Sequence, residues 1–222
     1  MNTDRKAHPA KFTANLLPVM AEMLRPCTRI IDPFGGVGGV FQLHQWLTVE
    51  IQAVEIEEEW ARQHPWTTHG DALALPWDDG YFDGACTSPT YANRMADHHK
   101  AKDASKRITY THCLGRDLHP HNSGRLQWGK EYRDFHLAAW LELRRVLCDG
   151  AHFAWNGKNH IRKGQEVDVV GWHLQTLQDL GFELREVRHI RTPGMRNGQN
   201  RSARVPAEVV AHLVLHKEAG RA

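Results

Sequence analysis

The sequence has only four cysteines and no long run of apolar residues. Cys27, Cys86, Cys113 and Cys148 lie far apart and form no Cys-x-x-Cys pair, which argues against a disulfide framework and favours a reducing, cytoplasmic setting. No apolar stretch approaches the roughly 18 residues of a membrane helix, and the N-terminus shows no signal-peptide core. We therefore expect neither a disulfide-rich secreted domain nor a membrane-spanning one.

An excess of one charge sign is also nearly absent, because 28 Lys and Arg residues offset 26 Asp and Glu residues and leave a net charge of +2. That total hides a segregation along the chain. Residues 50–83 hold nine acids and one base, a balance of −8. Residues 92–130 hold eight bases and three acids, and residues 185–205 hold six and one, a balance of +5 in each segment. The two basic segments predict a polyanionic partner, with solvated basic loops as the alternative.

The chain of 222 residues, 41% hydrophobic and 24% charged, is large enough for one globular domain. Short β-branched or apolar runs predict strands at 28–32, 49–55, 66–69, 82–87, 151–155, 182–187 and 208–215. Helical spacing predicts helices at 40–47, 57–64, 132–147 and 167–180. This order predicts an α/β fold, with helices on both faces of a mostly parallel sheet and one of the last two strands antiparallel.

A glycine-rich turn, Asp32–Gly39 (DPFGGVGG), follows the first predicted strand. It does not fit GxGxxG, because Phe41 stands where the last glycine belongs, and the chain has no P-loop. Acids follow three successive strands instead: Asp32 suits an ammonium group, Glu55 ribose hydroxyls and Asp71 an adenine amine. Together they predict S-adenosylmethionine, with three unrelated loop acids as the alternative.

Further motifs give the sequence a resemblance to the amino-group DNA methyltransferases, which methylate N4 of cytosine or N6 of adenine. In order, the motifs are HPAKF (His8–Phe12), DPFGGVGG, VEIEEEW (Val54–Trp60), GDA (Gly70–Ala72), TSPTY (Thr87–Tyr91) and RVPAEVVAHLVLHK (Arg204–Lys217). The resemblance covers nearly the whole chain and implies a Rossmann-like, seven-stranded methyltransferase sheet. The cofactor-binding residues that it and the strand-end acids indicate are Lys11, Phe12, Asp32, Pro33, Phe34, Gly35, Gly36, Gly38, Glu55 and Asp71.

The TSPTY motif is where the resemblance places the catalytic residues, Ser88, Pro89 and Tyr91. An exocyclic ring amine is a weak nucleophile, since its lone pair is delocalised into the ring. The Ser88 side chain and, by the resemblance, the Pro89 carbonyl would accept hydrogen bonds from the N–H groups of the amine and orient its nitrogen for direct methyl transfer. Tyr91 would stack on the target base after it flips out of the duplex. An ordinary turn with a packed tyrosine is the alternative.

Two positions depart from the family pattern. Thr90 stands where the family has the second proline of Ser-Pro-Pro-Tyr, and Gly39 stands where it often has threonine. Thr90 therefore implies either a looser catalytic loop or a changed target. The serine of the motif favours N4 of cytosine over N6 of adenine.

Methylation at cytosine C5 would require a Pro-Cys nucleophile after the fourth strand. The only such pair, Pro26–Cys27, precedes the first strand, and Cys86 is expected to be buried within the fourth. We therefore exclude C5 chemistry.

Residues 92–130 follow the catalytic motif as a polar insertion without apolar periodicity, in which Tyr110 and Trp128 are interleaved with basic residues. We expect this insertion to bind the target strand, with a disordered lid as the alternative, and the stretch 185–204 to form a second edge of the DNA cleft. The predicted DNA-binding residues are Asn93, Arg94, Lys106, Arg107, Arg116, Arg196 and Arg201. The histidines of the insertion and Cys113 match no zinc-ligand spacing, so we predict no metal site.

The sequence thus predicts a single methyltransferase domain over residues 1–222, which uses S-adenosylmethionine to methylate an exocyclic amine of double-stranded DNA. An RNA base methyltransferase and a catalytically inactive DNA-binding relative are the alternatives.

Overall fold

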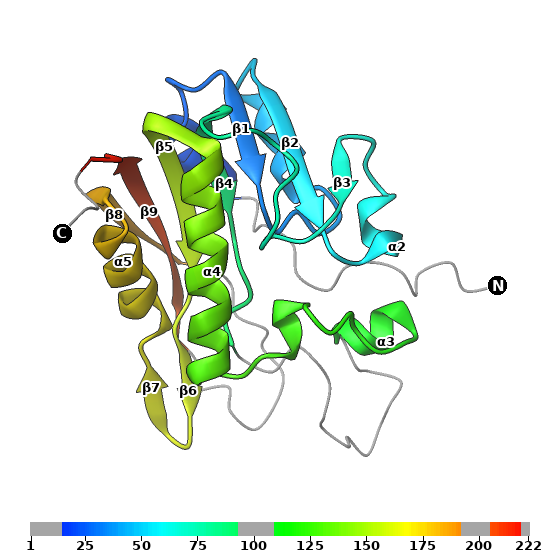
Figure 1. Ribbon diagram of the computed structural model, residues 1–222. Coiled ribbons are helices and arrows are strands. Elements are labelled where there is room, and N and C mark those ends of the chain that lie inside the picture. Colours follow the sequence, from blue (N-terminus) through cyan, green and yellow to red (C-terminus); the bar gives the residue numbers. More distant parts are fainter. Residues whose placement is uncertain (1–14, 93–108, 192–204, 219–222) are drawn as a thin grey trace.

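A computed structural model describes residues 15–92, 109–191 and 205–218 of the chain. Its centre is a seven-stranded sheet in the order β3-β2-β1-β4-β5-β9-β8 (Figure 1). The strands are β1 (Arg29–Asp32), β2 (Glu50–Glu55), β3 (Thr67–His69), β4 (Phe82–Thr87), β5 (Leu147–Gly157), β8 (Phe182–Arg191) and β9 (Ala207–Leu215). Strands β1 to β5 are parallel, whereas β9 runs antiparallel to both β5 and β8. The predicted seven-stranded, mostly parallel sheet is therefore confirmed.

Helices and a small hairpin complete the described part of the chain. The helices are α1 (Leu17–Met23), η2 (Gly39–Gln45, a 3₁₀ helix), α2 (Glu58–Ala61), α3 (Tyr110–Leu114), η4 (Ser123–Arg125, also 3₁₀), α4 (Lys130–Val146) and α5 (Val169–Asp179). The hairpin pairs β6 (His160–Arg162) with β7 (Gln165–Val167) outside the main sheet. None of the described helices has both the length and the apolarity needed to cross a bilayer.

Side chains alternate between two cores, because successive residues of a strand point to opposite faces of the sheet. The core that includes Trp140 and Leu143 of α4 takes from the strands Ile31, Ala85, Phe153 and Ala211. The core that includes Met20 of α1 takes their chain neighbours Ile30, Cys86, Ala154 and Val210. Figure 1 shows α4 and α5 in front of the sheet and α1 behind it. The expectation that Cys86 is buried in its strand is confirmed.

Three predicted boundaries are corrected by the structure. The expected helix at 40–47 is a 3₁₀ helix, and the one at 57–64 has only the single α-turn Glu58–Ala61. The strand expected at 151–155 is longer, because β5 begins at Leu147 and includes Asp149 and Gly150. There the pairing with β4 shifts from Phe82↔Leu147 to Gly84↔His152, so the chain bulges instead of turning away from the sheet.

The described part of the predicted insertion, residues 109–130, is folded onto the domain. Tyr110 and Leu118 are buried in a small core with Trp60 of α2. These apolar residues are too widely spaced for a helical or strand period, which is why the sequence indicated no packing here. Tyr110, which the sequence grouped with the residues expected to contact the target strand, is instead buried, since only 5% of its surface is exposed.

Candidate active site

A cavity of about 390 Å³ lies where the turn after β1 meets the ends of β2 and β4. In open parallel sheets, ligands bind outside the carboxyl ends of the strands, where the strand order reverses. Here β1 lies between β2 and β4, which places the reversal at this cavity. The predicted site residues that line it are Pro33, Phe34, Gly35, Gly36, Gly38, Glu55, Asp71, Ser88, Pro89 and Tyr91. The structure therefore brings the expected cofactor motifs and the expected catalytic motif to one cavity.

The glycine turn lies directly against β2. The Gly35 amide donates to the Val54 carbonyl at 2.8 Å, and the Gly36 amide donates to Glu55 Oε2 at 2.9 Å. A Cβ at Gly35 would lie 2.7 Å from Ala53 Cβ, closer than such atoms can approach. Gly36 and Gly38 have φ of 54° and 81°, in the left-handed region that favours glycine. The turn thus needs glycine both for close approach and for conformation.

Two buried carboxyl groups lie at the ends of β1 and β2. Asp32 does not line the cavity; its Oδ1 accepts from Thr87 Oγ1 at 2.6 Å and from the Phe34 amide at 3.0 Å. Glu55 accepts from the amides of Gly36 and Glu57. Burial raises the pKa of each carboxyl to about 7, because it disfavours the charged form more than these hydrogen bonds stabilise it. Each is therefore poised to ionise near neutral pH.

A segment from α3 to η4 covers part of the cavity, which Tyr110, His121, Asn122 and Ser123 line. Its anchor is the fully buried Glu57, whose Oε1 accepts from the His119 amide and from Asn122 Nδ2, both at 2.8 Å.

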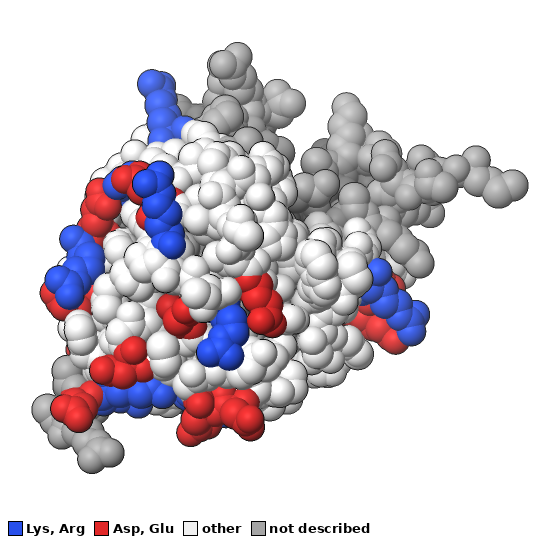
Figure 2. Space-filling view, turned by 90° about the horizontal axis from the view of Figure 1, so that it is seen from above, with Lys and Arg blue, Asp and Glu red and all other residues white. Residues whose placement is uncertain are grey.

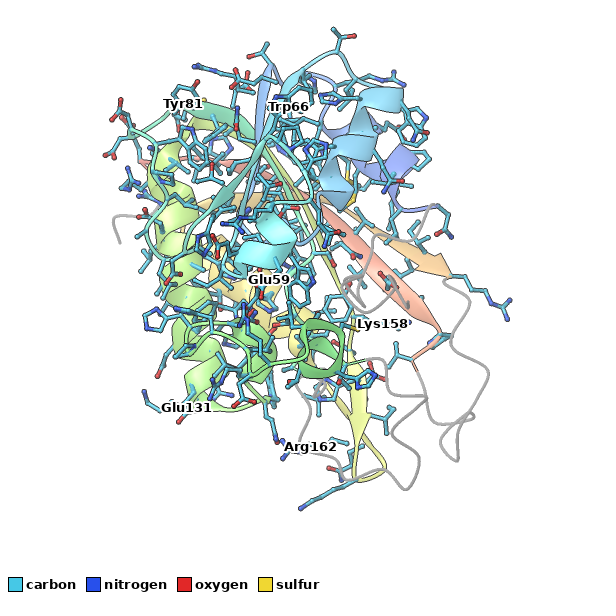
Figure 3. All side chains as sticks on the ribbon, turned by 90° about the vertical axis from the view of Figure 1, so that its right-hand side faces the viewer. Glu59, Trp66, Tyr81, Glu131, Lys158 and Arg162 are labelled. Atoms are coloured by element: carbon cyan, nitrogen blue, oxygen red, sulfur yellow. The ribbon has the colours of Figure 1, made fainter. Side chains whose placement is uncertain are left out.

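Arg116, a predicted DNA contact, holds the same segment to α2. Its Nη2 lies 2.7 Å from Glu57 Oε2, and its Nε donates to Glu59 Oε1 at 2.9 Å. Figure 3 labels Glu59 on α2, on the side of the molecule where α3 lies. His121 Nδ1 lies 2.8 Å from Oδ2 of Asp71. Sequence reasoning did not predict this network, because it joins residues about 50 to 65 positions apart.

Four polar side chains meet at the catalytic end of the cavity. Ser88 Oγ and Tyr91 Oη are 2.7 Å apart, and each lies within 2.9 Å of Asn156 Oδ1. Tyr91 Oη also lies 3.4 Å from Glu208 Oε2. Burial and the Glu208 carboxylate raise the pKa of Tyr91 well above its usual value, so its hydroxyl remains protonated. Sequence reasoning missed Asn156 and Glu208; the one signal was a polar residue within the apolar run that ends β5.

Thr90, the departure from the family motif, is held on both sides. Its Oγ1 donates to Ser123 Oγ at 3.0 Å, which ties the catalytic loop to the covering segment. Its carbonyl accepts from the Tyr132 hydroxyl at 2.6 Å. Tyr132 Oη lies 2.9 Å from His173 Nε2, and His173 Nδ1 accepts from Trp140 Nε1 at 3.1 Å. A buried chain of hydrogen bonds from α4 and α5 therefore supports the loop.

Replacing Tyr132 with Phe is expected to destabilise the fold by about 1–3 kcal/mol, because the Thr90 carbonyl and His173 Nε2 lose their partner in a buried place. Chemical denaturation measures the change. Tyr81→Phe is the matched control, since the Tyr81 ring contacts Phe82 and Arg29 while its hydroxyl makes no hydrogen bond within the described residues. Equal stability of the two variants would contradict this role of Tyr132.

The remaining predicted site residues lie outside the described residues: Lys11, Phe12, Asn93, Arg94, Lys106, Arg107, Arg196 and Arg201. Of the basic stretch 185–204, β8 carries Arg185, Arg188 and Arg191, of which Arg185 and Arg188 pair with carboxylates. Figure 2 shows the end of the molecule away from the cavity, where acidic and basic side chains of the described residues lie interspersed. Within the described ranges, no three His, Cys, Asp or Glu side chains are grouped to hold a metal ion.

The comparisons with known proteins place the fold. No protein-family model and no curated protein match the sequence. Among solved structures, a SAM-dependent methyltransferase of Methanosarcina mazei has a TM-score of 0.58 at 12% identity, over 93% of this chain and 99% of that one. A SAM-dependent methyltransferase of Aquifex aeolicus has a TM-score of 0.51 at 13% identity, over 90% of this chain and 89% of that one.

A geranyl diphosphate methyltransferase, solved with GPP and sinefungin, has a TM-score of 0.56 at 12% identity, over 90% of this chain and 77% of that one. The chain is therefore similar in fold to SAM-dependent methyltransferases. Because a fold can host many functions, the substrate has to be argued from the site.

Proposed function

We propose that this protein is an S-adenosylmethionine-dependent DNA methyltransferase that methylates an exocyclic amine of a flipped base, with N4 of cytosine favoured over N6 of adenine. One observation carries the proposal: Ser88, Pro89 and Tyr91 line the same cavity as the glycine turn, Glu55 and Asp71. The residues expected to bind the cofactor and the residues expected to hold the target amine therefore share one cavity.

The residues around the glycine turn fit the proposed cofactor. When bound, S-adenosylmethionine would supply a sulfonium methyl group, and the bonding pair of its S–C bond would return to sulfur on transfer. Gly35 packs against β2 and also lines the cavity, so a ligand there would lie against the backbone of the turn. Glu55 would accept hydrogen bonds from the ribose hydroxyls and Asp71 from the adenine amine. Asp32 would attract the ammonium group electrostatically, although its side chain does not line the cavity.

The target half of the cavity suits a planar amine. Ser88 Oγ and the Pro89 carbonyl would each accept a hydrogen bond from one N–H group of the amine. This arrangement would turn the nitrogen lone pair toward the methyl group. The lone pair forms the new N–C bond, and the nitrogen then releases one proton to solvent. Neither Cys27 nor Cys86 lines the cavity, and burial raises the pKa of both thiols. The exclusion of a cysteine nucleophile thus agrees with where the structure places these two side chains.

DNA as the substrate is supported by the resemblance of the TSPTY motif and by the basic segments that flank the site in sequence. Within the described residues, however, Arg116, Arg185 and Arg188 are engaged by carboxylates. We therefore assign phosphate contacts chiefly to the predicted residues outside the described ranges. Arg116 is given the structural role of anchoring the covering segment.

Incubation of the full chain with S-adenosylmethionine and either duplex DNA or RNA, followed by mass spectrometry of the nucleosides, tests the proposal. N4-methylcytosine in DNA is the expected product, and N6-methyladenine would support the same enzyme class with the other base. Methylation of RNA but not of DNA would identify RNA as the substrate and contradict the proposal. Cofactor binding without transfer to either polymer would indicate an inactive relative.

Cofactor affinity is expected to depend on pH. Ionised Asp32 and Glu55 favour the cationic cofactor, and burial raises the pKa of both to about 7 in the free protein. As the pH falls below that value, binding must first remove a proton, so the Kd should rise by about tenfold per pH unit for each coupled carboxyl. Calorimetry on both sides of neutrality measures this slope. Asp32→Asn should make it shallower, and a Kd that does not change with pH would refute the mechanism.

A further inference from the structure

Asn156 occupies the carboxyl end of β5, the neighbour of the strand that leads into Ser88. It lines the cavity, although only 1% of its surface is exposed. Its Nδ2 donates to the Val209 carbonyl of β9 at 3.1 Å. Because a carbonyl can only accept, this bond turns the amide so that Oδ1 faces the hydroxyls of Ser88 and Tyr91.

We propose that Asn156 is a positioning residue whose Oδ1 accepts the hydrogen bond that the Ser88 hydroxyl donates and so leaves the lone pairs of Ser88 Oγ to accept from the target amine. The inference rests on the function proposed above. It adds to the TSPTY motif a residue that lies 68 positions after Ser88 in the sequence. Ser88 Oγ lies 2.9 Å from Asn156 Oδ1, and a serine hydroxyl has one proton and two lone pairs. With its proton directed to Asn156, its lone pairs are available to the amine N–H bonds.

The direction of that proton matters for the reaction. A serine hydroxyl without a fixed acceptor could donate to the amine nitrogen and occupy the lone pair that has to attack the methyl group. Asn156 Oδ1 is an acceptor without a proton of its own, so it removes this competing arrangement.

Tyr91 is directed in the same way. Its hydroxyl lies 2.8 Å from Asn156 Oδ1 and 3.4 Å from Glu208 Oε2, so two acceptors other than Ser88 are within reach. The Tyr91 hydroxyl can therefore donate its hydrogen bond to one of these acceptors instead of to Ser88 Oγ. Asn156 pairs with Val210 in the register between β5 and β9. Because β9 begins at Ala207, the same register brings Glu208, its second residue, to this cluster.

Two substitutions separate positioning from a purely structural role. Asn156→Leu removes both the acceptor and the donor, whereas Asn156→Asp keeps an oxygen toward the hydroxyls and replaces the donor to Val209 with a second carboxyl oxygen. We expect the single-turnover methyl-transfer rate to fall about 100-fold in the Leu variant, as for other misplaced reacting groups, with the cofactor Kd unchanged. The Asp variant should recover most of that rate. Asp as slow as Leu would overturn the proposal, because the bond to Val209 would then explain the effect.

A double-mutant cycle with Ser88→Ala gives a second test. With no serine hydroxyl left to orient, Asn156→Leu should slow the residual rate of Ser88→Ala by far less than it slows the wild type. The same factor in both backgrounds would overturn the proposal. Should Asn156→Leu fail to fold, the cycle is run with Asn156→Asp, for which a small effect in the wild type supports the proposal and a 100-fold loss contradicts it.

The matched amide control is Gln175→Ala on the exposed side of α5, where the Gln175 side chain hydrogen-bonds only Asp179 among the described residues. Its rate should equal that of the wild type. If the wild type itself methylates no amine, the proposed function fails. If the wild type methylates and Asn156→Leu is equally fast, only the role of Asn156 fails.

Discussion

Replacing Ser88 with Ala is expected to lower methyl transfer by about 100- to 1,000-fold, the loss typical of removing one group that holds the reacting atoms in a preorganised site. The serine lines the target half of the cavity and is the hydroxyl best placed to accept from a target amine. Its loss leaves the amine held by the Pro89 carbonyl alone. Single-turnover transfer, with the product nucleoside quantified by mass spectrometry, measures the effect.

Cofactor binding is the control for this variant. The Kd measured by calorimetry should stay within error of the wild type, because Ser88 follows β4 and its side chain hydrogen-bonds Tyr91 and Asn156 among the described residues. A Ser88→Ala protein that transfers methyl groups at the wild-type rate would contradict the catalytic assignment. Loss of cofactor binding in the same variant would place Ser88 in the other half of the site.

Replacing Gly35 with Ala is expected to weaken cofactor binding by about 10- to 100-fold, from an overpacking cost of about 1–3 kcal/mol. The added Cβ would lie 2.7 Å from Ala53 Cβ and 3.3 Å from the Val54 carbonyl oxygen. Neither β2 atom can move aside like the end of a flexible side chain, so the turn itself has to shift. That shift would also disturb the bond from the Gly36 amide to Glu55. Calorimetric titration with S-adenosylmethionine measures the loss.

Gly129→Ala is the matched control. Gly129 has an extended φ of 171°, and an added Cβ would meet nothing closer than the Gln127 carbonyl at 3.7 Å. Cofactor affinity should therefore be unchanged. Unaltered binding in Gly35→Ala would mean that the turn is not part of the cofactor site.

The order of motifs and strands was readable from the sequence because each depends on local patterns. β-branched runs and glycine turns indicated the seven strands, and the acids and the TSPTY motif could be placed at strand ends. Since the carboxyl ends of parallel strands meet at one edge of a sheet, residues as distant as Gly36 and Ser88 were expected to share a site. Both do line one cavity.

Local patterns also explain what was missed. α1 (LPVMAEM) has buried residues on more than one side, and α3 and η4 are too short to show a period. The covering segment is held by the buried carboxylate of Glu57, a role that nothing in the acidic run around it distinguishes from that of its exposed neighbours.

The chemistry of the chain was therefore determined by its sequence, through which residue types stand at which strand ends. Only the tertiary structure decided how those residues are held. The contacts of Ser88 with Asn156 and of Tyr91 with Glu208 span 68 and 117 positions. The first contact exists because β4 pairs with β5 in one parallel register, and the second because antiparallel β9 pairs with β5 in another. Register between distant strands is set by the packing of the whole sheet.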